Sequence, residues 1–194
     1  SKVFVTTDSN YISEIARSEY GFECPYLRPK KISKDKSNDK EYVFHFLDYL
    51  NKIKSFLPNI IIQLRPTTPF RNHTIIKAAI KKLESNKICT SLRSVENFSH
   101  PIEKVFKIKN NFYVNYKGNQ ISNENFNRPR QDFKKVYKPN GYVDILKISH
   151  LIKKKDIYGN KILSFITPKT IEIDDIDDFK MVQNLDKKFF RKFK

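Results

Sequence analysis

An acidic stretch near the end of the chain, residues 171–179, concentrates carboxylates in a sequence whose formal net charge is +17. In an extended segment, residues two apart share a face, so Glu172 and Asp174 are expected to point the same way while Ile171 and Ile173 point into the fold. Two neighbouring carboxylates repel one another unless a cation lies between them. Hard oxygen ligands suit Mg²⁺, which usually takes one or two protein carboxylates and completes its shell with water and phosphate oxygens. The stretch therefore predicts Mg²⁺ as a cofactor and chemistry on phosphate.

A structural role is the alternative for the same acids. Carboxylates near the start of a helix satisfy free backbone N–H groups and interact favourably with the helix dipole. Asp175, Asp177 and Asp178 fit this capping role, because a helix is expected over residues 175–190. Spacing alone leaves metal binding and capping open for Glu172 and Asp174.

Length and composition limit the classes of protein. A chain of 194 residues suits one well-buried domain, and its 39% hydrophobic content argues against disorder. The positive charge attracts phosphate in general, but lysines are scattered through every segment, so no nucleic-acid partner is expected. The longest apolar run, at residues 60–64, is too short to span a membrane. No membrane partner is therefore expected. Cys24 and Cys89 lack metal or redox spacing, which predicts reduced thiols in a cytoplasmic protein.

Strand-like and helix-like segments alternate along much of the chain. This alternation predicts an α/β fold, a Rossmann-like three-layer sandwich with a mostly parallel sheet, whose ligand crevice lies at the carboxyl ends of the strands. The expected strands are residues 3–7, 22–27, 59–64, 88–95, 141–145 and 162–166, and the expected helices are residues 11–20, 41–56, 73–83 and 175–190. Residues 1–194 are expected to form a single domain, and one that is N-terminally truncated, because the sequence enters a strand directly and without an initiator Met.

The middle of the chain has a different character. Two short strands at 105–108 and 112–116, joined by Lys-Asn-Asn, predict a β-hairpin inside an inserted arm and loop over residues 101–135. The loop after the hairpin is polar and Asn-rich and contains Arg130 and Gln131. Such an arm serves either for dimerisation or as a surface flap.

Several junctions between these elements carry distinctive motifs. They are Thr-Thr-Asp-Ser at 6–9, Leu-Arg-Pro at 27–29, Gln-Leu-Arg-Pro-Thr-Thr-Pro-Phe-Arg at 63–71, Pro-Arg-Gln-Asp at 129–132, Tyr-Lys-Pro-Asn-Gly at 137–141, and Glu-Ile-Asp at 172–174 followed by Asp178 and Phe179. Together and in this order they resemble the acylneuraminate cytidylyltransferases, the synthetases that join CTP to sialic acid and related nine-carbon keto-sugar acids. The resemblance covers nearly the whole chain and implies a fold of the nucleotide-diphospho-sugar transferase type.

The resemblance implies an activity and its catalytic residues. CMP would pass from CTP to the anomeric hydroxyl of the sugar acid with release of pyrophosphate, with Mg²⁺ held by Glu172 and Asp174. Arg130 suits the sugar carboxylate, because a guanidinium can bind it through two hydrogen bonds. The family usually carries Asp at the position of Glu172, and the longer carboxylate still reaches a metal. The resemblance further implies a homodimer.

Residues expected to bind substrate are spread over several junctions. They are Arg28, Asp39, Arg65, Thr67, Thr68, Gln131, Asn140 and Asp144. Arg28 and Asp39 flank the segment expected to wall the nucleotide. Arg65 stands where sialic-acid enzymes typically carry Gln, and Asp144 where they often carry Tyr. A cation and an anion in place of neutral groups predict an altered sugar choice, such as a legionaminic-type acid.

One family segment has no counterpart in residues 1–194. It is a first strand with a basic turn of the Ala-Arg-x-x-Ser-Lys type, which normally precedes Thr6 and holds the triphosphate. Either the chain is truncated or it is an inactive relative, and residues 1–194 alone are expected not to turn over CTP. Two other functions remain as alternatives: another sugar nucleotidyltransferase of the same fold, and a non-catalytic nucleic-acid binder whose affinity would fall steeply with salt. The scattered charge disfavours the second.

Overall fold

A computed structural model describes residues 2–53, 57–121 and 124–185. Contacts divide the chain into two compact units. Unit 1 combines Ser1–Asn59 with Ile148–Ile157, and unit 2 combines Ile60–Lys147 with Tyr158–Lys194. Each unit buries its own set of apolar side chains. None of the helices in the described part of the chain is long and apolar enough to cross a membrane.

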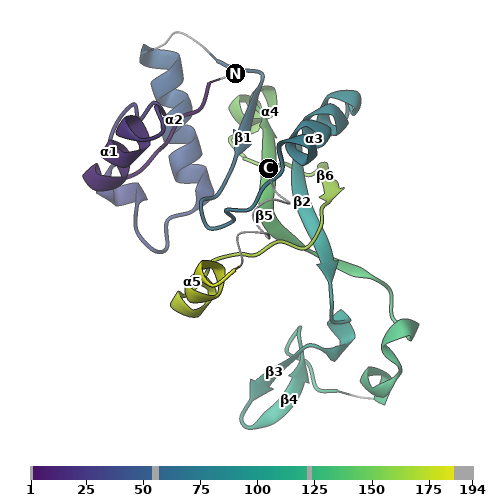
Figure 1. The fold of residues 1–194 in the computed structure, drawn as a ribbon. Coiled ribbons are helices and arrows are strands. Elements are labelled where there is room, and N and C mark those ends of the chain that lie inside the picture. The colour runs from purple at the N-terminus through teal and green to yellow at the C-terminus, as the bar shows by residue number, and fades with distance from the viewer. Residues whose placement is uncertain (1, 54–56, 122–123, 186–194) are drawn as a thin grey trace. The chain divides into compact units, whose positions relative to one another are not determined.

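Unit 1 is mainly helical (Figure 1). Its helices are α1 (Asn10–Ser18), α2 (Asp39–Ile53) and α4 (Ile148–Lys154), with a 3-10 turn at Lys30–Ile32. Two isolated parallel bridges, Phe4 with Glu23 and Thr7 with Leu27, stand where the sequence predicted two strands. The two segments therefore run parallel to one another, but as isolated bridges and not as the two continuous strands that the sequence predicted.

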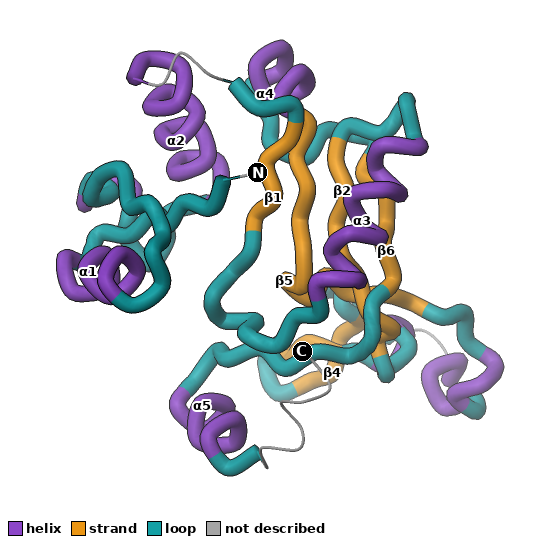
Figure 2. The backbone as a smooth tube through the Cα atoms, turned by 45° about the horizontal axis from the view of Figure 1, so that its top comes forward, coloured by secondary structure: helices purple, strands orange, loops and turns teal. Residues whose placement is uncertain are grey.

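Unit 2 is built on a four-stranded sheet with the order β1-β5-β2-β6 (Figures 1 and 2). The strands are β1 (Ile60–Gln63), β2 (Ser91–Phe98), β5 (Val136–Lys147) and β6 (Ile162–Ile166). β2 pairs parallel with β6, whereas β5 pairs antiparallel with both β1 and β2. The mixed α/β class with a central sheet is confirmed. The predicted mostly parallel sheet and three-layer sandwich are not, because β5 returns between β1 and β2 in the opposite direction.

Helix α3 (His73–Ser85) covers one face of this sheet (Figure 2). Asn72 caps the helix by accepting a hydrogen bond from Thr74 N at 2.8 Å. Apolar side chains at helical spacing then face the strands, and Ala79 and Leu83 are almost fully buried. They pack with alternate residues of β2 and β5, among them Leu92 and Ile145. Because strand residues alternate between faces, the neighbours of these core residues point to the opposite face.

A bulge interrupts the pairing of β5 with β2. Arg93 pairs with Asp144, but Val95 pairs with Pro139, so residues 140–143 stand against Ser94. Gly141 within the bulge has a φ of +61°. The sequence predicted a turn at Pro-Asn-Gly and a strand only over 141–145. Instead, β5 continues through the motif, and the extra residues are accommodated as a bulge, a feature often found beside active sites.

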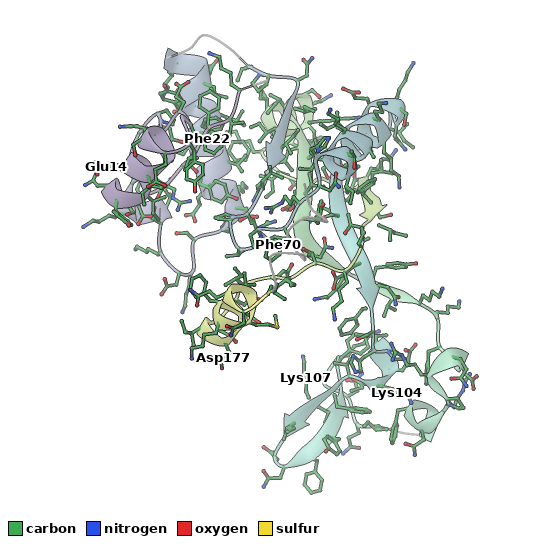
Figure 3. All side chains as sticks on the ribbon, viewed as in Figure 1. Glu14, Phe22, Phe70, Lys104, Lys107 and Asp177 are labelled. Carbon is green, nitrogen blue, oxygen red and sulfur yellow. The ribbon has the colours of Figure 1, made fainter. Side chains whose placement is uncertain are left out.

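The predicted hairpin is confirmed as β3 (Phe106–Lys109) and β4 (Phe112–Asn115). Together with 3-10 turns at Ile102–Lys104, Glu124–Asn127 and Arg130–Asp132, it forms the arm over residues 101–135. Figure 1 shows the hairpin beyond the end of β2; in Figure 3, Lys107 lies on β3 and Lys104 in the 3-10 turn that precedes it. Its role in dimerisation stays a prediction.

Helix α5 (Ile176–Gln183) is shorter than the predicted helix over residues 175–190. Its start agrees with the prediction to within one residue. Residues 186–190 of the prediction, and the basic tail that follows, lie outside the described part of the chain. Asp177 lies on this helix, and Phe70, which is buried, precedes α3 (Figure 3).

Candidate active site

Three segments that are far apart in the sequence meet at Gly141. A Cβ atom placed on this residue would lie 2.9 Å from Thr68 Oγ1, 3.4 Å from Glu172 Oε1 and 3.9 Å from Arg65 Cδ. The turn after β1, the bulge of β5 and the acidic segment therefore crowd around one backbone position. Only glycine combines the positive φ with enough space here, which explains the residue type at the centre of the site.

Backbone hydrogen bonds hold the acidic segment against the turn after β1. Thr68 N donates to Arg65 O at 3.1 Å and closes the turn, and the flanking prolines restrict its conformation. Ile173 N then donates to Thr67 O at 2.8 Å. The main chain thus fixes the position of the Glu172 backbone beside the turn, independently of any side-chain contact.

The capping role and the candidate metal role fall on different acids. Asp175 is the N-cap of α5, and its Oδ1 accepts from Asp177 N at 2.9 Å and from Asp178 N at 2.8 Å. The Asp178 carboxylate accepts from Asp174 N at 3.0 Å. Capping by Asp175 is therefore confirmed. The carboxylates of Glu172 and Asp174 take no part in these caps.

Several charges surround Glu172. Burial raises the pKa of its carboxyl group above the usual 4.5, and the carboxylates of Asp174 and Glu96 act in the same direction. The cations of Lys138 and Arg65 lower the pKa and oppose this shift. Lys138 Nζ lies 3.5 Å from Glu96 Oε1. Negative charge at Glu172 is therefore only partly compensated by the chain itself.

The local chemistry fits a hard divalent cation. A cation beside Glu172 and Asp174 would stabilise the charged form of Glu172 and so oppose the burial and the neighbouring carboxylates that raise its pKa. The hydroxyl of Thr170, two residues earlier, is buried with no hydrogen-bond partner among the described residues. No group of three or more His, Cys, Asp or Glu side chains that could hold a metal occurs in the described part of the chain. A pair of carboxylates is enough for Mg²⁺, which keeps several waters and substrate oxygens.

Asp144 organises a second group of charges next to Arg65. Its side chain is 1% exposed, and Arg65 Nη1 donates to Oδ2 at 2.9 Å while Arg93 Nε donates to Oδ1 at 3.2 Å. Tyr158 Oη also donates to Oδ2, at 3.0 Å. Burial raises the pKa of Tyr158 to about 12, and the Asp144 carboxylate adds to this shift, so the phenol stays a donor at neutral pH. Asp144 can therefore act on a ligand only through the residues that it positions.

Asn140 is likewise enclosed rather than open to a ligand. It is fully buried, and its Nδ2 donates to Thr167 Oγ1 at 2.7 Å and to Glu96 Oε2 at 3.3 Å. Thr170 N donates to the same Glu96 oxygen at 3.1 Å. The sequence predicted that Asn140 would contact substrate, but the structure uses its amide to join the bulge to the segment that leads to Glu172.

Arg71 fastens the bulge to the turn after β1. Its Nε donates to Tyr142 O at 2.7 Å, and its Nη2 donates to Arg65 O at 2.7 Å and to Gly141 O at 3.1 Å. Burial lowers the pKa of Arg71 to about 10, and the nearby Arg65 cation acts in the same direction. The side chain remains charged at neutral pH and serves as a backbone clamp.

Arg130 and Gln131 lie in the arm, apart from the residues around Gly141. They line an open pocket of about 410 Å³ together with Lys134, Lys135 and aromatic side chains such as Phe133. Both residues are exposed. The pocket is basic, as the predicted role in binding a carboxylate requires, but the structure does not bring it together with Glu172.

Arg28 and Asp39 lie in unit 1. Arg28 Nε donates to Ser33 Oγ at 3.0 Å, its Nη2 lies 3.7 Å from Asp8 Oδ1, and its guanidinium lies 5.5 Å from the centre of the Tyr42 ring. Asp39 begins α2. Arg28 is thus held by local contacts and is preorganised as a donor within its own unit.

Sequence reasoning missed the residues that position the site. They are Arg71, Arg93, Glu96, Lys138 and Tyr158. Arg93 and Glu96 lie on β2, a strand in which Ser91, Leu92 and Ser94 are buried, and a charged residue inside a largely buried strand was the one available signal. The role of Arg71 had no local signal, because two of its three acceptors, the carbonyl groups of Gly141 and Tyr142, are about seventy residues away.

Comparison with solved structures indicates the fold. CMP:2-keto-3-deoxy-manno-octonic acid synthetase complexed with CTP superposes with a TM-score of 0.60 at 11% identity, over 95% of this chain and 82% of that chain. This likeness, together with the central mixed sheet, indicates a nucleotidyltransferase fold. No protein-family model matches the chain.

Sequence relatives carry the identification further. N-acylneuraminate cytidylyltransferase of Escherichia coli O18:K1:H7 is 29% identical over 96% of this chain. CMP-N,N'-diacetyllegionaminic acid synthase of Legionella pneumophila is 26% identical over 91% of it, and pseudaminic acid cytidylyltransferase of Campylobacter jejuni 23% over 95%. The chain is thus a homologue of these cytidylyltransferases, as its motifs predicted. It spans 42% of the length of the Escherichia coli relative and 72% and 77% of the other two.

Proposed function

We propose that this protein transfers CMP from CTP to a nine-carbon keto-sugar acid, with release of pyrophosphate and with Mg²⁺ as cofactor. The names of the homologues support the reaction and the substrate class. The observation that carries the proposal is the meeting of Glu172, Thr68 and Arg65 around Gly141. This meeting supports the proposal because a partly buried carboxylate and the cation of Arg65 lie close together at the bulge of β5, where three of the motifs converge.

Glu172 and Asp174 would hold the metal ion. When bound, Mg²⁺ supplies charge neutralisation at the α-phosphate and favours the deprotonated form of the attacking hydroxyl. The chain itself supplies positioning: Ile173 N on Thr67 O fixes the carboxylates against the turn. Such positioning matters in phosphoryl transfer because little covalent chemistry is left for the protein to perform.

Arg65 is the group through which this protein would choose its sugar. Its guanidinium is fixed on Asp144 and its stem lies beside Gly141, so it presents a cation where a neutral residue is typical of the sialic-acid enzymes. We expect a preference for a legionaminic-type or related acid over N-acetylneuraminate. Arg130 and Gln131 on the arm would bind the sugar carboxylate and hydroxyl groups.

The active form would be a homodimer built through the arm. Ile108, Phe112 and Tyr113 of the hairpin are 75%, 74% and 71% exposed. Ile108 and Tyr113 are cross-strand partners on one face of the hairpin, and Phe112 lies on the other. Exposed apolar and aromatic side chains of this kind are typical of a surface that another chain covers. The proposed location is the cytoplasm, where the buried thiols of Cys24 and Cys89 would remain reduced.

Nucleotide and sugar selectivity test the proposal. In the presence of Mg²⁺ the protein should bind CTP more tightly than UTP or GTP, and should bind N,N'-diacetyllegionaminate or pseudaminate more tightly than N-acetylneuraminate. Preference for UTP or GTP would indicate another sugar nucleotidyltransferase instead. Pyrophosphate release by residues 1–194 would support the function and overturn the expectation that this stretch alone does not turn over CTP.

A further inference from the structure

Arg93 lies on the face of the sheet opposite α3, in the strand next to Asp144. The two residues are direct partners in the pairing of β2 with β5, so their side chains emerge side by side. The two oxygens of the Asp144 carboxylate have different partners, however. Oδ1 accepts from Arg93, whereas Oδ2 accepts from Arg65 and Tyr158. One buried carboxylate therefore serves two guanidinium groups, and the charge of Arg93 is compensated only in part.

The orientation of Arg93 is fixed in the absence of any ligand. Its guanidinium carbon lies 4.4 Å from the centre of the Tyr158 ring, so the group is held over the ring while Nε bonds to Asp144. Nη1 and Nη2 of Arg93 have no acceptor among the described residues of the protein. The side chain is 27% exposed, so these donors are neither in bulk water nor buried out of reach.

A cluster that only joined strands would not need this arrangement. A single guanidinium forming two parallel bonds to Asp144 would satisfy the carboxylate and its own charge together. Here the terminal amino groups of Arg93 are instead left available beside Arg65, whose stem reaches Gly141 and the surroundings of Glu172. Rigid, partly desolvated donors of this kind are preorganised for an oxyanion from outside the protein.

We propose that Arg93, together with Arg65 and positioned by Asp144 and Tyr158, forms an oxyanion-binding subsite beside the carboxylate pair. The ligand is a carboxylate or phosphate group. In the reaction proposed above, on which this assignment of sources rests, such a group comes either from the sugar acid or from the phosphates of CTP. The subsite is separate from the pocket of Arg130 on the arm, so if the subsite takes the sugar carboxylate, Arg130 does not.

Titration of oxyanions without divalent metal tests the subsite directly. Inorganic pyrophosphate and, separately, N-acetylneuraminate and N,N'-diacetyllegionaminate are titrated in EDTA into the wild-type protein, Arg93→Gln and Arg93→Lys. Lys82→Gln is the matched control, because Lys82 also combines a hydrogen bond, to Ser164 O, with a ring contact, to Phe165, but on α3 at the opposite face. Melting temperatures report whether each variant is folded.

Arg93→Gln should weaken binding of one ligand class about tenfold or more, because charge-assisted hydrogen bonds are lost. Arg93→Lys should lie between, since it keeps the charge but loses the fork of donors, and Lys82→Gln should match the wild type. If Arg93→Gln does not fold, Arg93→Lys decides. Loss confined to pyrophosphate assigns the subsite to the nucleotide, and loss confined to the sugar acids assigns it to the sugar.

Two results would overturn the inference. One is that Arg93→Gln and Arg93→Lys bind every ligand as tightly as the wild type, which would leave Arg93 with a structural role only. The other is that the wild-type protein binds none of these anions at millimolar concentration. Failure of the proposed function would be recognised by a different result. The wild-type protein would not bind CTP in the presence of Mg²⁺, whether or not the Arg93 variants change oxyanion binding in EDTA.

Discussion

Unit 2 contains two regions that each have an ion pair between an arginine and an aspartate, but the two pairs differ in their exposure to solvent. Around Gly141, Arg65 and Asp144 form an ion pair of 2.9 Å whose side chains are 27% and 1% exposed. In the arm, Arg128 and Asp132 approach to 3.7 Å with side chains that are 51% and 42% exposed. The first pair is part of the packed sheet, whereas the second is a surface contact screened by water.

The same contrast holds for backbone strain. In the hairpin, Asn110 and Asn111 adopt φ values of 50° and 65°, which asparagine tolerates in a two-residue turn. At the bulge, Gly141 has a similar φ of +61°, but its surroundings also exclude a side chain. Substitutions at the sheet site should therefore change stability and binding together, and those in the arm should change binding alone.

Removing the carboxylate of Asp144 should give the largest effect. Asp144→Ala leaves the guanidiniums of Arg65 and Arg93 without their shared partner, and breaking a buried pair in this way costs about 3–5 kcal/mol. Asp132→Ala, the matched change in the arm, should cost about 0–1 kcal/mol. Denaturant unfolding of both variants measures the difference, and equal costs would remove the distinction between the two regions.

Gly141→Ala should come next. The new methyl group would meet Thr68 Oγ1 at 2.9 Å, and the positive φ adds strain, so we expect a loss of about 1–3 kcal/mol together with weaker ligand binding. Gly118→Ala in the arm loop is the control, because its φ of +91° is also unfavourable for alanine but nothing lies within 4 Å of the added atom. A larger loss from Gly118→Ala than from Gly141→Ala would show that crowding at the site is unimportant.

Neutralising Glu172 should give the smallest change in stability, and it should stabilise the folded protein where the other two substitutions destabilise it. Burial raises the pKa of Glu172, so the folded protein binds a proton more readily than the unfolded chain. This contribution to stability is fully present below pH 4.5 and is lost as the pH rises through the raised pKa. In EDTA, Glu172→Gln should therefore raise the melting temperature at neutral pH and flatten its decline from pH 4.5 upward.

The exposed acid Glu103 in the arm provides the control for that measurement. At neutral pH, Glu103→Gln should leave the melting temperature within about 1 °C of the wild type, because substitutions of exposed residues change stability little. A profile of Glu172→Gln that coincides with the wild type would mean that burial and the neighbouring carboxylates do not disfavour the charged form of Glu172 in the folded state, and would remove one support for the metal site.

Elements with a strong local pattern could be predicted from the sequence. The strand at residues 162–166 matches β6, and the helix predicted from residue 73 starts where α3 starts, because apolar spacing and the Asn72 cap are local signals. The presence of two carboxylates, Glu172 and Asp174, after the last strand could likewise be seen in the sequence. Helix α4 (Ile148–Lys154) was missed, since seven residues carry too little periodicity to stand out.

Features decided by distant partners could not be predicted. The direction of β5 and its bulge depend on pairing with β1 and β2, and no local signal distinguishes a Pro-Asn-Gly turn from this bulge. Asn140 and Asp144 were expected to meet substrate because amide and carboxylate groups suit that role. Their burial follows from acceptors and donors on other strands. Arg65, one donor to Asp144, was predicted from the sequence, but Arg93, the other guanidinium, had to come from the structure.

The most direct test of the account is a calorimetric titration of CTP with Mg²⁺ into the wild-type protein, Asp174→Ala and Asp177→Ala. Asp177 is close in sequence and equally acidic, but it lies in the first turn of α5, and its side chain is 85% exposed. We predict metal-dependent binding of CTP that is lost in Asp174→Ala and retained in Asp177→Ala. Equal binding by all three folded proteins would contradict the placement of the metal and nucleotide at Glu172 and Asp174.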